Sequence, residues 1–379
     1  MGYHSAMRIL HVGKYYAPHK GGMETALRLM AEGLLAEDHD VRVLVAGHAR
    51  RTVRDDLPGA PGALIRAGVA GRWNSQPLTL GLAVELKRQI RDFEPDVVHL
   101  HTPNPLACSA WLLAARTARR AGSRLAVWHH SDIVRQRLGA KLVGPMVRRC
   151  LGQAHGLCVS SRQLRQTSRE LEPWREQVAV IPFGIDMAPY EELQPTGGGA
   201  FLFVGRLVPY KGLETLLTAL GRVPEARLDI VGNGPLRERL ARRLREEKLA
   251  HRVRLLGEVT DSQLLRLLEA SRALVLPSRD HSETFGLSLL EGMAAGLPLI
   301  ASDLPTGVRD LARPGQTGWL VRPGDPEDLA RTLSTCLARE DEARRLGAGG
   351  RALVRRQFTR ARLAQDLAAW YESLVREKT

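Results

Sequence analysis

The chain repeats one pattern along nearly its whole length: a short apolar run, a polar loop rich in glycine, and a longer run with apolar residues three and four positions apart. The first example is Arg8–Val12, followed by the loop Gly13–Gly22 and the periodic run Met23–Leu34. Short apolar runs indicate buried strands, and the three- and four-residue spacing indicates helices. Strands that alternate with helices in this way predict an α/β protein with parallel, doubly wound sheets, which bind ligands at the carboxyl ends of their strands.

The pattern is interrupted once, near the middle of the chain. Pro182–Asp186 and Pro195–Gly199 have the proline and glycine content of a hinge and a linker. A chain of 379 residues also exceeds the size of a single comfortable core. We therefore expect two doubly wound, Rossmann-like domains that face each other across a cleft between their strand ends.

Composition excludes several other classes of protein. With 44% hydrophobic and 25% charged residues, the chain is neither disordered nor fibrous. No apolar run approaches the roughly 20 residues of a membrane-spanning helix, and Met1–Ala6 lacks the apolar region of a signal peptide. The cysteines have neither metal-binding nor disulfide-framework spacing, which favours a reduced, cytosolic setting. They are Cys108, Cys150, Cys158 and Cys336.

The formal net charge of +14 implies an anionic partner, such as nucleic acid, a lipid surface or a phosphorylated small molecule. Nucleic-acid binding needs aromatic stacking platforms among basic residues, and aromatic residues make up only 5% of this chain. The helical stretch 133–151 carries a basic stripe that suits anionic lipid headgroups, although a solvated helix face explains it equally well. The stripe consists of Arg135, Arg137, Lys141, Arg148 and Arg149.

A pair of glycines precedes the first predicted helix. Gly21 and Gly22 stand where strand-loop-helix units bring backbone amides towards a diphosphate, although such a pair also serves as a plain turn. The loop does not match the GxGxxG fingerprint of dinucleotide-binding proteins. We expect the pair to contact a phosphate-bearing ligand.

Histidines gather at the predicted carboxyl ends of two strands of the first half, 97–101 and 124–128. They are His99, His101, His129 and His130. No carboxylate or cysteine completes a recognisable metal-binding spacing, so we expect no metal site. One histidine of the group His129-His130-Ser131-Asp132 is better placed as a partner of a bound phosphate or sugar. Capping of the next helix by Ser131 or Asp132 is an alternative that can hold at the same time.

Four loops follow predicted strands of the second half. In the first, Arg206 and Lys211 straddle a helix start, and Gly205 and Gly212 hold the loop close to whatever binds there. Two cations beside a helix N-terminus suit a diphosphate, because they neutralise its charge and stabilise it as a leaving group. Two exposed surface cations are the alternative interpretation.

The remaining three loops carry further candidates. Gly232-Asn233 and Gly257-Glu258-Val259 form glycine-containing turns that can hold a nucleotide or act as ordinary turns. The stretch Ser282–Pro298 places Glu283 in a polar loop and Glu291 in an apolar helical run. A helix N-terminus suits a phosphate, and carboxylates beside it suit sugar hydroxyls. Alternatively, the first acid stabilises its own helix and the second is simply a satisfied helix residue.

Together these motifs resemble glycosyltransferase family 4, whose members are retaining enzymes of the GT-B fold. The motifs that carry the resemblance are Gly21-Gly22, the His130-Ser131-Asp132 group, Arg206 with Lys211, and the acidic pair Glu283 and Glu291. The resemblance spans the chain from Met7, and the second-half motifs are its specific part. The stretch Trp128–Gln136 is similar to that of enzymes that build bacterial surface polysaccharides, often from mannose- or rhamnose-type donors.

The resemblance implies a role for each matching residue. Arg206 and Lys211 bind the donor diphosphate, Glu291 holds the ribose hydroxyls, and Glu283 contacts the transferred sugar. His130 corresponds to the family's active-site histidine, with His129 as the alternative because the doubled histidine leaves the register open. The other implied donor contacts are Gly21, Gly22, Gly232, Asn233, Glu258, Val259 and the backbone around Phe285, Gly286 and Leu287.

The resemblance also implies an activity and a domain plan. Residues 7–190 form the acceptor domain, residues 197–358 form the donor domain, and residues 359–379 form a helix that crosses back to the first domain. The reaction moves a hexose from a nucleotide-diphosphate sugar to a glycan or lipid-linked saccharide, with retention and with no metal or cofactor. The expected setting is cytoplasmic, and the basic stripe adds peripheral contact with the inner face of the cell membrane as an option.

Two other functions compete with this one. A nucleotide-sugar epimerase of the same fold also needs a nucleotide-sugar cleft, but Glu283 and Glu291 together with Arg206 and Lys211 argue against it. A basic nucleic-acid-binding protein is disfavoured by the low and scattered aromatic content. Product analysis with and without an acceptor separates the first alternative from a transferase, and a salt-resistant electrophoretic shift would support the second.

Overall fold

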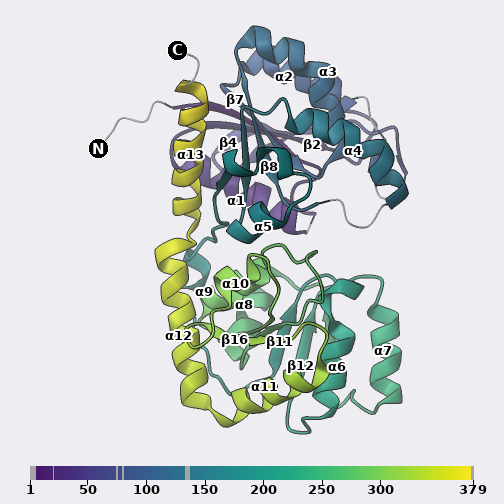
Figure 1. Ribbon diagram of the computed structural model, residues 1–379, viewed down its shortest axis with the longest axis vertical. Helices are drawn as coiled ribbons and strands as arrows, with labels where there is room; N and C mark the ends of the chain where they lie inside the picture. The colour runs from purple at the N-terminus through teal and green to yellow at the C-terminus, as the bar shows by residue number, and fades with distance from the viewer. Residues whose placement is uncertain (1–5, 20, 74–75, 79–80, 133–136, 377–379) are drawn as a thin grey trace. The chain divides into compact units, whose positions relative to one another are not determined.

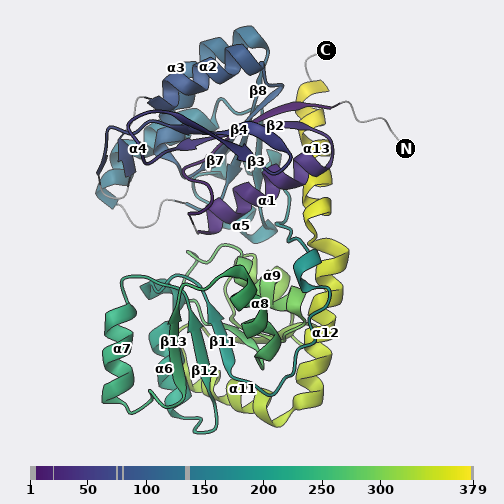
Figure 2. The same cartoon turned by 180° about the vertical axis from the view of Figure 1, so that it is seen from behind.

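In the computed structural model the chain divides into two compact units: unit 1, Met1–Phe183 together with Arg360–Thr379, and unit 2, Gly184–Thr359. The structure describes residues 6–376 apart from residues 20, 74–75, 79–80 and 133–136. Figures 1 and 2 show that each unit consists of a sheet covered by helices. None of the helices formed by the described residues has the length and apolar character needed to cross a membrane.

Unit 1 is built on an eight-stranded sheet with the order β10-β9-β8-β7-β1-β2-β4-β3. All of its strands run parallel except β3, which pairs antiparallel with β4. The strands are β1 (Arg8–Val12), β2 (Asp40–Ala46), β3 (Val53–Leu57), β4 (Ala60–Ala67), β7 (Val97–Thr102), β8 (Arg124–His129), β9 (Gly156–Val159) and β10 (Val178–Val180), and β5 (Gly71–Trp73) and β6 (Gln76–Leu78) form a separate ribbon. The strand order reverses between β1 and β7, so the topological switch point of unit 1 lies there.

Helices cover both faces of this sheet. They are α1 (Gly22–Ala36), α2 (Gly81–Phe93), α3 (Pro105–Ala121), α4 (Arg137–Leu151), α5 (Arg162–Thr167) and α13 (Arg360–Arg376). The C-terminal helix α13 lies against α1 (Figure 1), where a Cβ on Gly33 would approach the Cβ of Ala364 to 3.1 Å. Helix α13 therefore completes the fold of unit 1.

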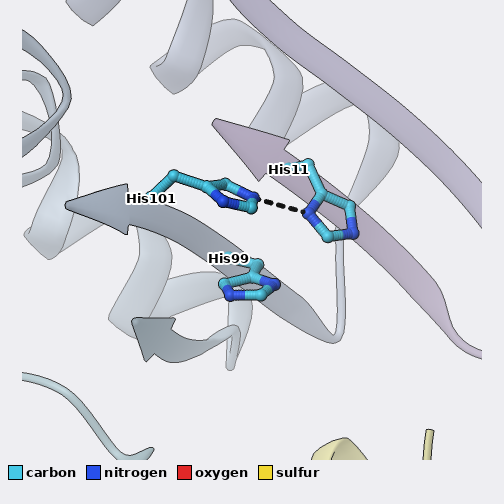
Figure 3. Close-up of side chains that lie close together, drawn as sticks. All are labelled: His11, His99 and His101. Atoms are coloured by element: carbon cyan, nitrogen blue, oxygen red, sulfur yellow. Dashed lines mark hydrogen bonds between the residues drawn. The ribbon is translucent and has the colours of Figure 1, made fainter. Parts of the chain in front are cut away.

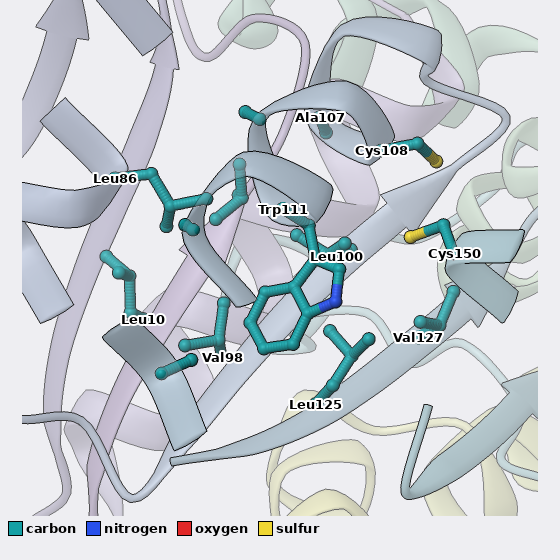
Figure 4. Close-up of a cluster of buried hydrophobic side chains, with 14 of the residues drawn as sticks. Leu10, Leu86, Val98, Leu100, Ala107, Cys108, Trp111, Leu125, Val127 and Cys150 are labelled. Carbon is teal, nitrogen blue, oxygen red and sulfur yellow. The ribbon is translucent and has the colours of Figure 1, made fainter. Parts of the chain in front are cut away.

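The two faces of the unit 1 sheet have different chemistry because side chains alternate along each strand. On one face, Leu10, Val98 and Leu125 pack with Trp111 of α3 in a fully apolar core (Figure 4). The positions between them place His11 and His99 on the opposite face, where the two residues are register partners. The sheet thus buries an apolar layer on one side and polar rings on the other.

Unit 2 is built on a six-stranded, fully parallel sheet with the order β13-β12-β11-β14-β15-β16. Its strands are β11 (Phe201–Val204), β12 (Leu228–Val231), β13 (Val253–Gly257), β14 (Leu274–Leu276), β15 (Leu299–Ser302) and β16 (Gly318–Val321). Its helices are α6 (Leu213–Gly221), α7 (Arg237–Glu246), α8 (Asp261–Ala270), α9 (Leu287–Ala295), α10 (Val308–Leu311), α11 (Pro326–Ala338) and α12 (Glu340–Gln357). Helix α6 packs against α11, and α9 packs against α12. The strand order reverses between β11 and β14.

The predicted pair of doubly wound α/β domains is confirmed, while the segment between the predicted domains is placed differently. The sequence assigns residues up to 190 to the first domain, whereas Gly184 already belongs to unit 2. The Ile185 N–H donates to the carbonyl oxygen of Phe358 at 2.8 Å, and the Arg351 guanidinium donates to the Leu193 carbonyl at 2.8 Å. These hydrogen bonds hold the segment against the end of unit 2.

Candidate functional site

The switch point of unit 2 is occupied by a buried ion pair. Lys211 follows β11 and Glu283 follows β14, and Lys211 Nζ lies 2.6 Å from Glu283 Oε2. The Ser278 hydroxyl donates to the same carboxylate oxygen at 2.8 Å. Only 8% of Lys211 and 6% of Glu283 are exposed. Two loops that the sequence predicts to carry ligand contacts therefore meet at the carboxyl end of the sheet.

The charge of Lys211 depends on its partner. Burial is the largest single influence and lowers the pKa of this lysine, but the charge of Glu283, the neighbouring Tyr210 and the hydrogen bond to Glu283 together outweigh it and leave the pKa above its ordinary value. Lys211 therefore stays protonated at neutral pH. Arg206, on the same loop, is exposed and opposes the lysine's charge only weakly. Of the two cations predicted for this loop, one is buried and paired and the other is open to solvent.

Glycines allow the neighbouring loops to approach one another closely. Gly212 has a φ of 74°, and a Cβ there would stand 1.9 Å from the Pro277 carbonyl oxygen. Gly232 has a φ of 125°, and its Cβ would stand 2.0 Å from the Gly205 carbonyl oxygen. Only glycine tolerates these positions. The loops after β11, β12 and β14 are thus packed backbone to backbone.

The remaining candidates of unit 2 surround these loops. The Leu207 N–H donates to the Asn233 carbonyl at 2.9 Å, and the Gly232 N–H donates to the Gly257 carbonyl at 2.7 Å, which connects the loops after β11, β12 and β13. Beyond Gly257, Glu258 is exposed and Val259 is half-buried. The predicted nucleotide-binding turns therefore lie together at the carboxyl ends of β11, β12 and β13.

Helix α9 begins where the sequence predicts a phosphate-binding helix start. Gly286 precedes the helix with a φ of 86°, and Leu287 is the first helical residue. The Phe285 ring is buried beside the Phe358 ring, with centroids 6.3 Å apart, so only its backbone remains for a ligand. Glu291 lies one turn into the helix and is half-buried. The helix start therefore offers backbone amides with one acid before it and one after it.

In unit 1, Gly21 is the residue before α1 and Gly22 is its first residue. Gly21 is extended, and the carboxylate of Glu24 lies beside it, 2.2 Å from where a Cβ would stand. A small pocket close to this point is lined by Gly13, Lys14, Tyr15, Met23, Glu24, Leu27, His101 and Asn104. The loop after β1, the first turn of α1 and the end of β7 thus enclose one space.

The switch point of unit 1 holds a group of buried imidazoles (Figure 3). His11 Nδ1 lies 3.2 Å from His101 Nε2, the contact that is dashed in Figure 3. His101 Nδ1 lies 3.0 Å from His130 Nε2. His99 stacks on His101 with ring centroids 4.7 Å apart, and its Nδ1 bonds the Tyr371 hydroxyl of α13 at 2.5 Å. We call His11, His101 and His130 the imidazole chain.

Burial removes the charge from these rings. It lowers the pKa of His101 to about 3 and lowers the pKa values of His11, His99 and His130 well below the ordinary range. For His11, His99 and His130, the neighbouring histidines lower the pKa further. All four rings are therefore neutral at pH 7.

The two adjacent histidines, His129 and His130, differ in their hydrogen bonds. His129 Nε2 bonds Asp132 Oδ1 at 3.1 Å, and His129 Nδ1 bonds the Thr102 hydroxyl at 3.1 Å, so both of its nitrogens are engaged. Asp132 also accepts hydrogen bonds from the Ser168 hydroxyl and the Arg169 N–H. These bonds overcome the effect of burial and lower the pKa of Asp132 to about 2. His130, which keeps 7% of its surface exposed, is left as the better candidate for ligand contact.

Among the described residues, two groups have the composition of a metal site. One is His11, His99 and His101; the other is His129, Asp132 and Glu170, and in each the ligand atoms lie within 4.8 Å of one another. Most of the ring nitrogens in these groups already make hydrogen bonds within the protein. The absence of a metal from this protein's chemistry stays a prediction.

Several residues of these two sites escape sequence analysis. His11, Ser278 and Tyr371 stand in ordinary apolar or polar contexts, and only the register of the strands and the packing of α13 bring them to their partners. Of the basic stripe, Arg148 and Arg149 are exposed on α4. The side chains of Arg137 and Lys141, and all of Arg135, lie outside the described residues.

Solved structures with this fold define its class. Sucrose-phosphate synthase from Thermosynechococcus elongatus aligns with a TM-score of 0.80 at 21% identity, covering 98% of this chain and 100% of that one. HepE from Anabaena, solved with UDP and glucose, aligns with a TM-score of 0.74 at 20% identity, covering 97% of this chain and 100% of that one. The two Rossmann-like units thus have the GT-B fold of glycosyltransferases.

Sequence comparisons give the family. Residues 20–188 match Glycosyltransferase Family 4, and residues 189–353 match Glycosyl transferases group 1. A D-rhamnosyltransferase of Pseudomonas aeruginosa is 30% identical over 93% of this chain and 92% of its own length. An O-antigen chain mannosyltransferase of Escherichia coli is 28% identical over 98% of this chain and 100% of its own length. The chain belongs to glycosyltransferase family 4.

Proposed function

We propose that this glycosyltransferase moves a hexose from a nucleotide-diphosphate sugar to a glycan or lipid-linked saccharide in bacterial surface polysaccharide synthesis. The observation that carries the proposal is the buried pair of Lys211 and Glu283 with the exposed Arg206 beside it. A cation that is held in place and stays protonated can stabilise the charge that develops on a departing diphosphate. A second cation with free access can bind the same group from solvent.

The backbone around the ion pair supports a phosphate-binding role. Helix α9 begins at Leu287 after Gly286, and the dipole at a helix N-terminus favours negative charge. Gly212, Gly232 and Gly286 let the surrounding loops lie close to a bound nucleotide. Glu291 then holds the ribose hydroxyls, and Glu283 orients Lys211 and contacts the transferred sugar.

The relatives support the choice of sugar and acceptor. A D-rhamnosyltransferase and an O-antigen chain mannosyltransferase are similar to this chain over nearly its whole length. A phosphatidyl-myo-inositol mannosyltransferase of Mycobacterium leprae is 30% identical over 97% of the chain. We therefore propose a mannose- or rhamnose-type donor and a saccharide or glycolipid acceptor.

The proposed reaction proceeds with retention and without a metal. As the bond to the diphosphate breaks, the sugar gains oxocarbenium character, and Lys211 and Arg206 stabilise the leaving group. A donor phosphate oxygen assists deprotonation of the acceptor hydroxyl on the same face. His130 contacts the sugar or the acceptor as a neutral imidazole.

The acceptor suggests where the enzyme works. If the acceptor is lipid-linked, the enzyme acts at the cytoplasmic face of a membrane. Arg148 and Arg149 are exposed on α4, and attraction between basic side chains and anionic headgroups holds a protein at such a surface. We propose that α4 makes this peripheral contact.

A panel of nucleotide sugars tests the proposal. We expect one GDP- or UDP-linked hexose to raise the melting temperature and to be hydrolysed slowly without acceptor, because water then replaces the acceptor hydroxyl. With a saccharide acceptor, NMR of the product should show the anomeric configuration of the donor. An epimerised nucleotide sugar without transfer would favour the epimerase alternative, and no stabilisation by any donor would contradict the donor site.

A further inference from the structure

The imidazole chain connects His130 to the interior of unit 1 through two nitrogen-to-nitrogen contacts, 3.0 Å and 3.2 Å long. We propose that His101, itself held by His11, is a positioning residue that fixes His130 as the tautomer with hydrogen on Nδ1. His130 then offers an N–H donor to a sugar or acceptor oxygen and does not act as a base. The consequence for catalysis rests on the proposed function, but the tautomer itself does not.

The reasoning starts from the neutrality of the rings. His11, His101 and His130 are buried, and among the described residues the charged or titratable groups that shift the pKa values of His11 and His130 are other histidines. For His101, burial lowers the pKa. A neutral imidazole carries one N–H and one lone pair. Each contact in the chain therefore needs a hydrogen on one nitrogen and a lone pair on the other, so the tautomers of the three rings are linked.

Two arrangements satisfy both contacts. In the first, His11 Nδ1–H donates to His101 Nε2, and His101 Nδ1–H donates to His130 Nε2. His130 then carries its hydrogen on Nδ1, and His11 keeps a lone pair on Nε2. In the second arrangement every hydrogen is reversed, so His130 Nδ1 is a lone pair and His11 Nε2 carries a hydrogen.

The inner end of the chain decides between them. His11 Nε2 is buried and has no hydrogen-bond partner among the residues that the structure describes. The second arrangement places an N–H there with no acceptor, and orphaned buried N–H groups are rarer than under-satisfied acceptors. The first arrangement leaves only a lone pair in that position. We therefore assign the first arrangement, in which His130 Nδ1–H is available to a ligand.

His99 provides a matched control within the same group. It lies on the same strand as His101, is equally buried, and stacks on its ring at 4.7 Å. Its hydrogen bond goes to Tyr371, so it is not part of the imidazole chain. A purely structural role for the buried histidines predicts similar effects of substitution at 99 and 101, whereas the proposal predicts different ones.

The test compares His101→Asn, His101→Leu and His99→Leu in the full-length protein. The asparagine amide can replace His101 Nδ1–H as a donor to His130, while leucine cannot. Histidine-selective ¹⁵N NMR reports which ring nitrogen of His130 is protonated. We expect hydrogen on Nδ1 in the wild type, in His101→Asn and in His99→Leu, and a mixture or hydrogen on Nε2 in His101→Leu.

Kinetics then test the consequence for transfer. His101→Leu should lower kcat by about tenfold or more with a smaller change in KM, because a donor needed in the transition state is no longer fixed. His101→Asn should restore most of kcat, and His99→Leu should lower it little. If leucine at 101 prevents folding, His11→Leu serves instead, because it frees the tautomer of His101 without altering His101.

Four outcomes would overturn the proposal. The first two concern the tautomer of His130: hydrogen on Nε2 in the wild type, or an unchanged tautomer in both His101→Leu and His11→Leu. The third is an equal loss of kcat in His99→Leu and His101→Leu. The fourth is stoichiometric Zn²⁺ binding that replaces the nitrogen-to-nitrogen contacts. If the tautomers respond as expected but no nucleotide sugar is a donor, the proposed function fails while the positioning role stands. If the protein transfers a hexose but the tautomer of His130 does not respond to the substitutions, the proposed function stands and the positioning role of His101 fails.

Discussion

The two units place opposite chemistry at the same topological position. At the switch point of unit 2, between β11 and β14, Lys211 and Glu283 form a buried ion pair. At the switch point of unit 1, between β1 and β7, His11, His99 and His101 are buried with neighbours that are also histidines. Burial acts on both groups, but among the described residues the ion pair of unit 2 contains its own counter-charge, whereas no carboxylate is hydrogen-bonded to the rings of His11, His99 or His101. The same fold therefore holds a charged site in one unit and a neutral one in the other.

This difference matches two different tasks in glycosyl transfer. In the proposed reaction the departing diphosphate is anionic, so it needs a cation that stays protonated when buried, and Lys211 beside Glu283 and Tyr210 is such a cation. Sugar hydroxyls are neutral, so a neutral imidazole with a fixed N–H can bind them without attracting phosphate. The partner of a buried group, and not the fold, determines which task each switch point can perform.

Substitution of Lys211 gives the largest expected effect. Lys211→Ala leaves Glu283 buried without its cation, so the free energy of unfolding should fall by about 3–5 kcal/mol. Loss of the leaving-group contact should lower kcat by about 10²- to 10³-fold. Urea unfolding and transfer assays measure the two effects.

A double variant separates stability from catalysis in unit 2. Lys211→Met combined with Glu283→Gln removes both charges, so most of the stability should return while transfer stays low. Near-wild-type transfer by Lys211→Ala would contradict the assignment of the site. Recovery of transfer in the double variant would show that the pair is structural only.

Much of this comparison can be predicted from the sequence, because apolar runs and loop positions are local signals. The runs that become β1, β7 and β8 are evident, and so are the glycine-flanked loops after β11 and β14. The hairpin of β3 and β4 is missed because Val53–Leu57 contains three charged residues and is mostly exposed. Strand β16 is missed because its four residues lie between glycine and proline turns.

The partners within each site are harder to predict, because they depend on register and packing. Lys211 and Glu283 are 72 residues apart, and only the order of β11 and β14 brings them together. His11 and His101 are 90 residues apart, and their contact requires the parallel register of β1 with β7. Alternation within a single strand predicts that His99 and His101 share a face of the sheet. It does not predict that His11, on another strand, lies beside them.

Acid should destabilise unit 1 more than unit 2. The folded pKa values of His11, His99, His101 and His130 are lowered, so the unfolded state binds more protons once the pH falls below about 6.5. Stability is fully present above that pH and is lost towards the folded pKa, which for His101 is about 3. Between pH 7 and pH 6 each ring should cost about 0.7 kcal/mol.

Hydrogen exchange resolved by peptide can locate this loss. After correction for the intrinsic exchange rate, protection should fall in β1, β7 and β8 and should change little in β11 and β14. Unit 2 provides the control because its two histidines, His251 and His281, are exposed. An equal loss in the two units would mean that the buried imidazoles do not control acid stability.

Substitution of Glu291 tests whether a charged residue of unit 2 outside the Lys211–Glu283 ion pair also binds the donor. Glu291→Ala should weaken binding of the donor nucleotide by about tenfold, because a carboxylate that accepts ribose hydroxyls contributes about 1–2 kcal/mol. Isothermal titration with the nucleoside diphosphate measures this change. Glu238→Ala, at an exposed position of α7 in the same unit, is the matched control and should bind normally. Equal affinity of the two variants would remove Glu291 from the donor site.

The smallest expected effect concerns the surface of unit 1. Its exposed arginines are charged, whereas its buried histidines are neutral. Arg149→Gln on α4 should weaken binding to vesicles of anionic phospholipid by about fivefold, since one basic residue near such a surface contributes about 1 kcal/mol. Arg120→Gln removes an equally exposed arginine from α3 and should leave binding unchanged. Vesicle flotation at two salt concentrations measures both variants. If Arg149→Gln and Arg120→Gln weaken vesicle binding equally, the net charge of the protein attracts it to the membrane and α4 has no special role. Unit 1 would then have a neutral interior without a membrane-binding surface on α4.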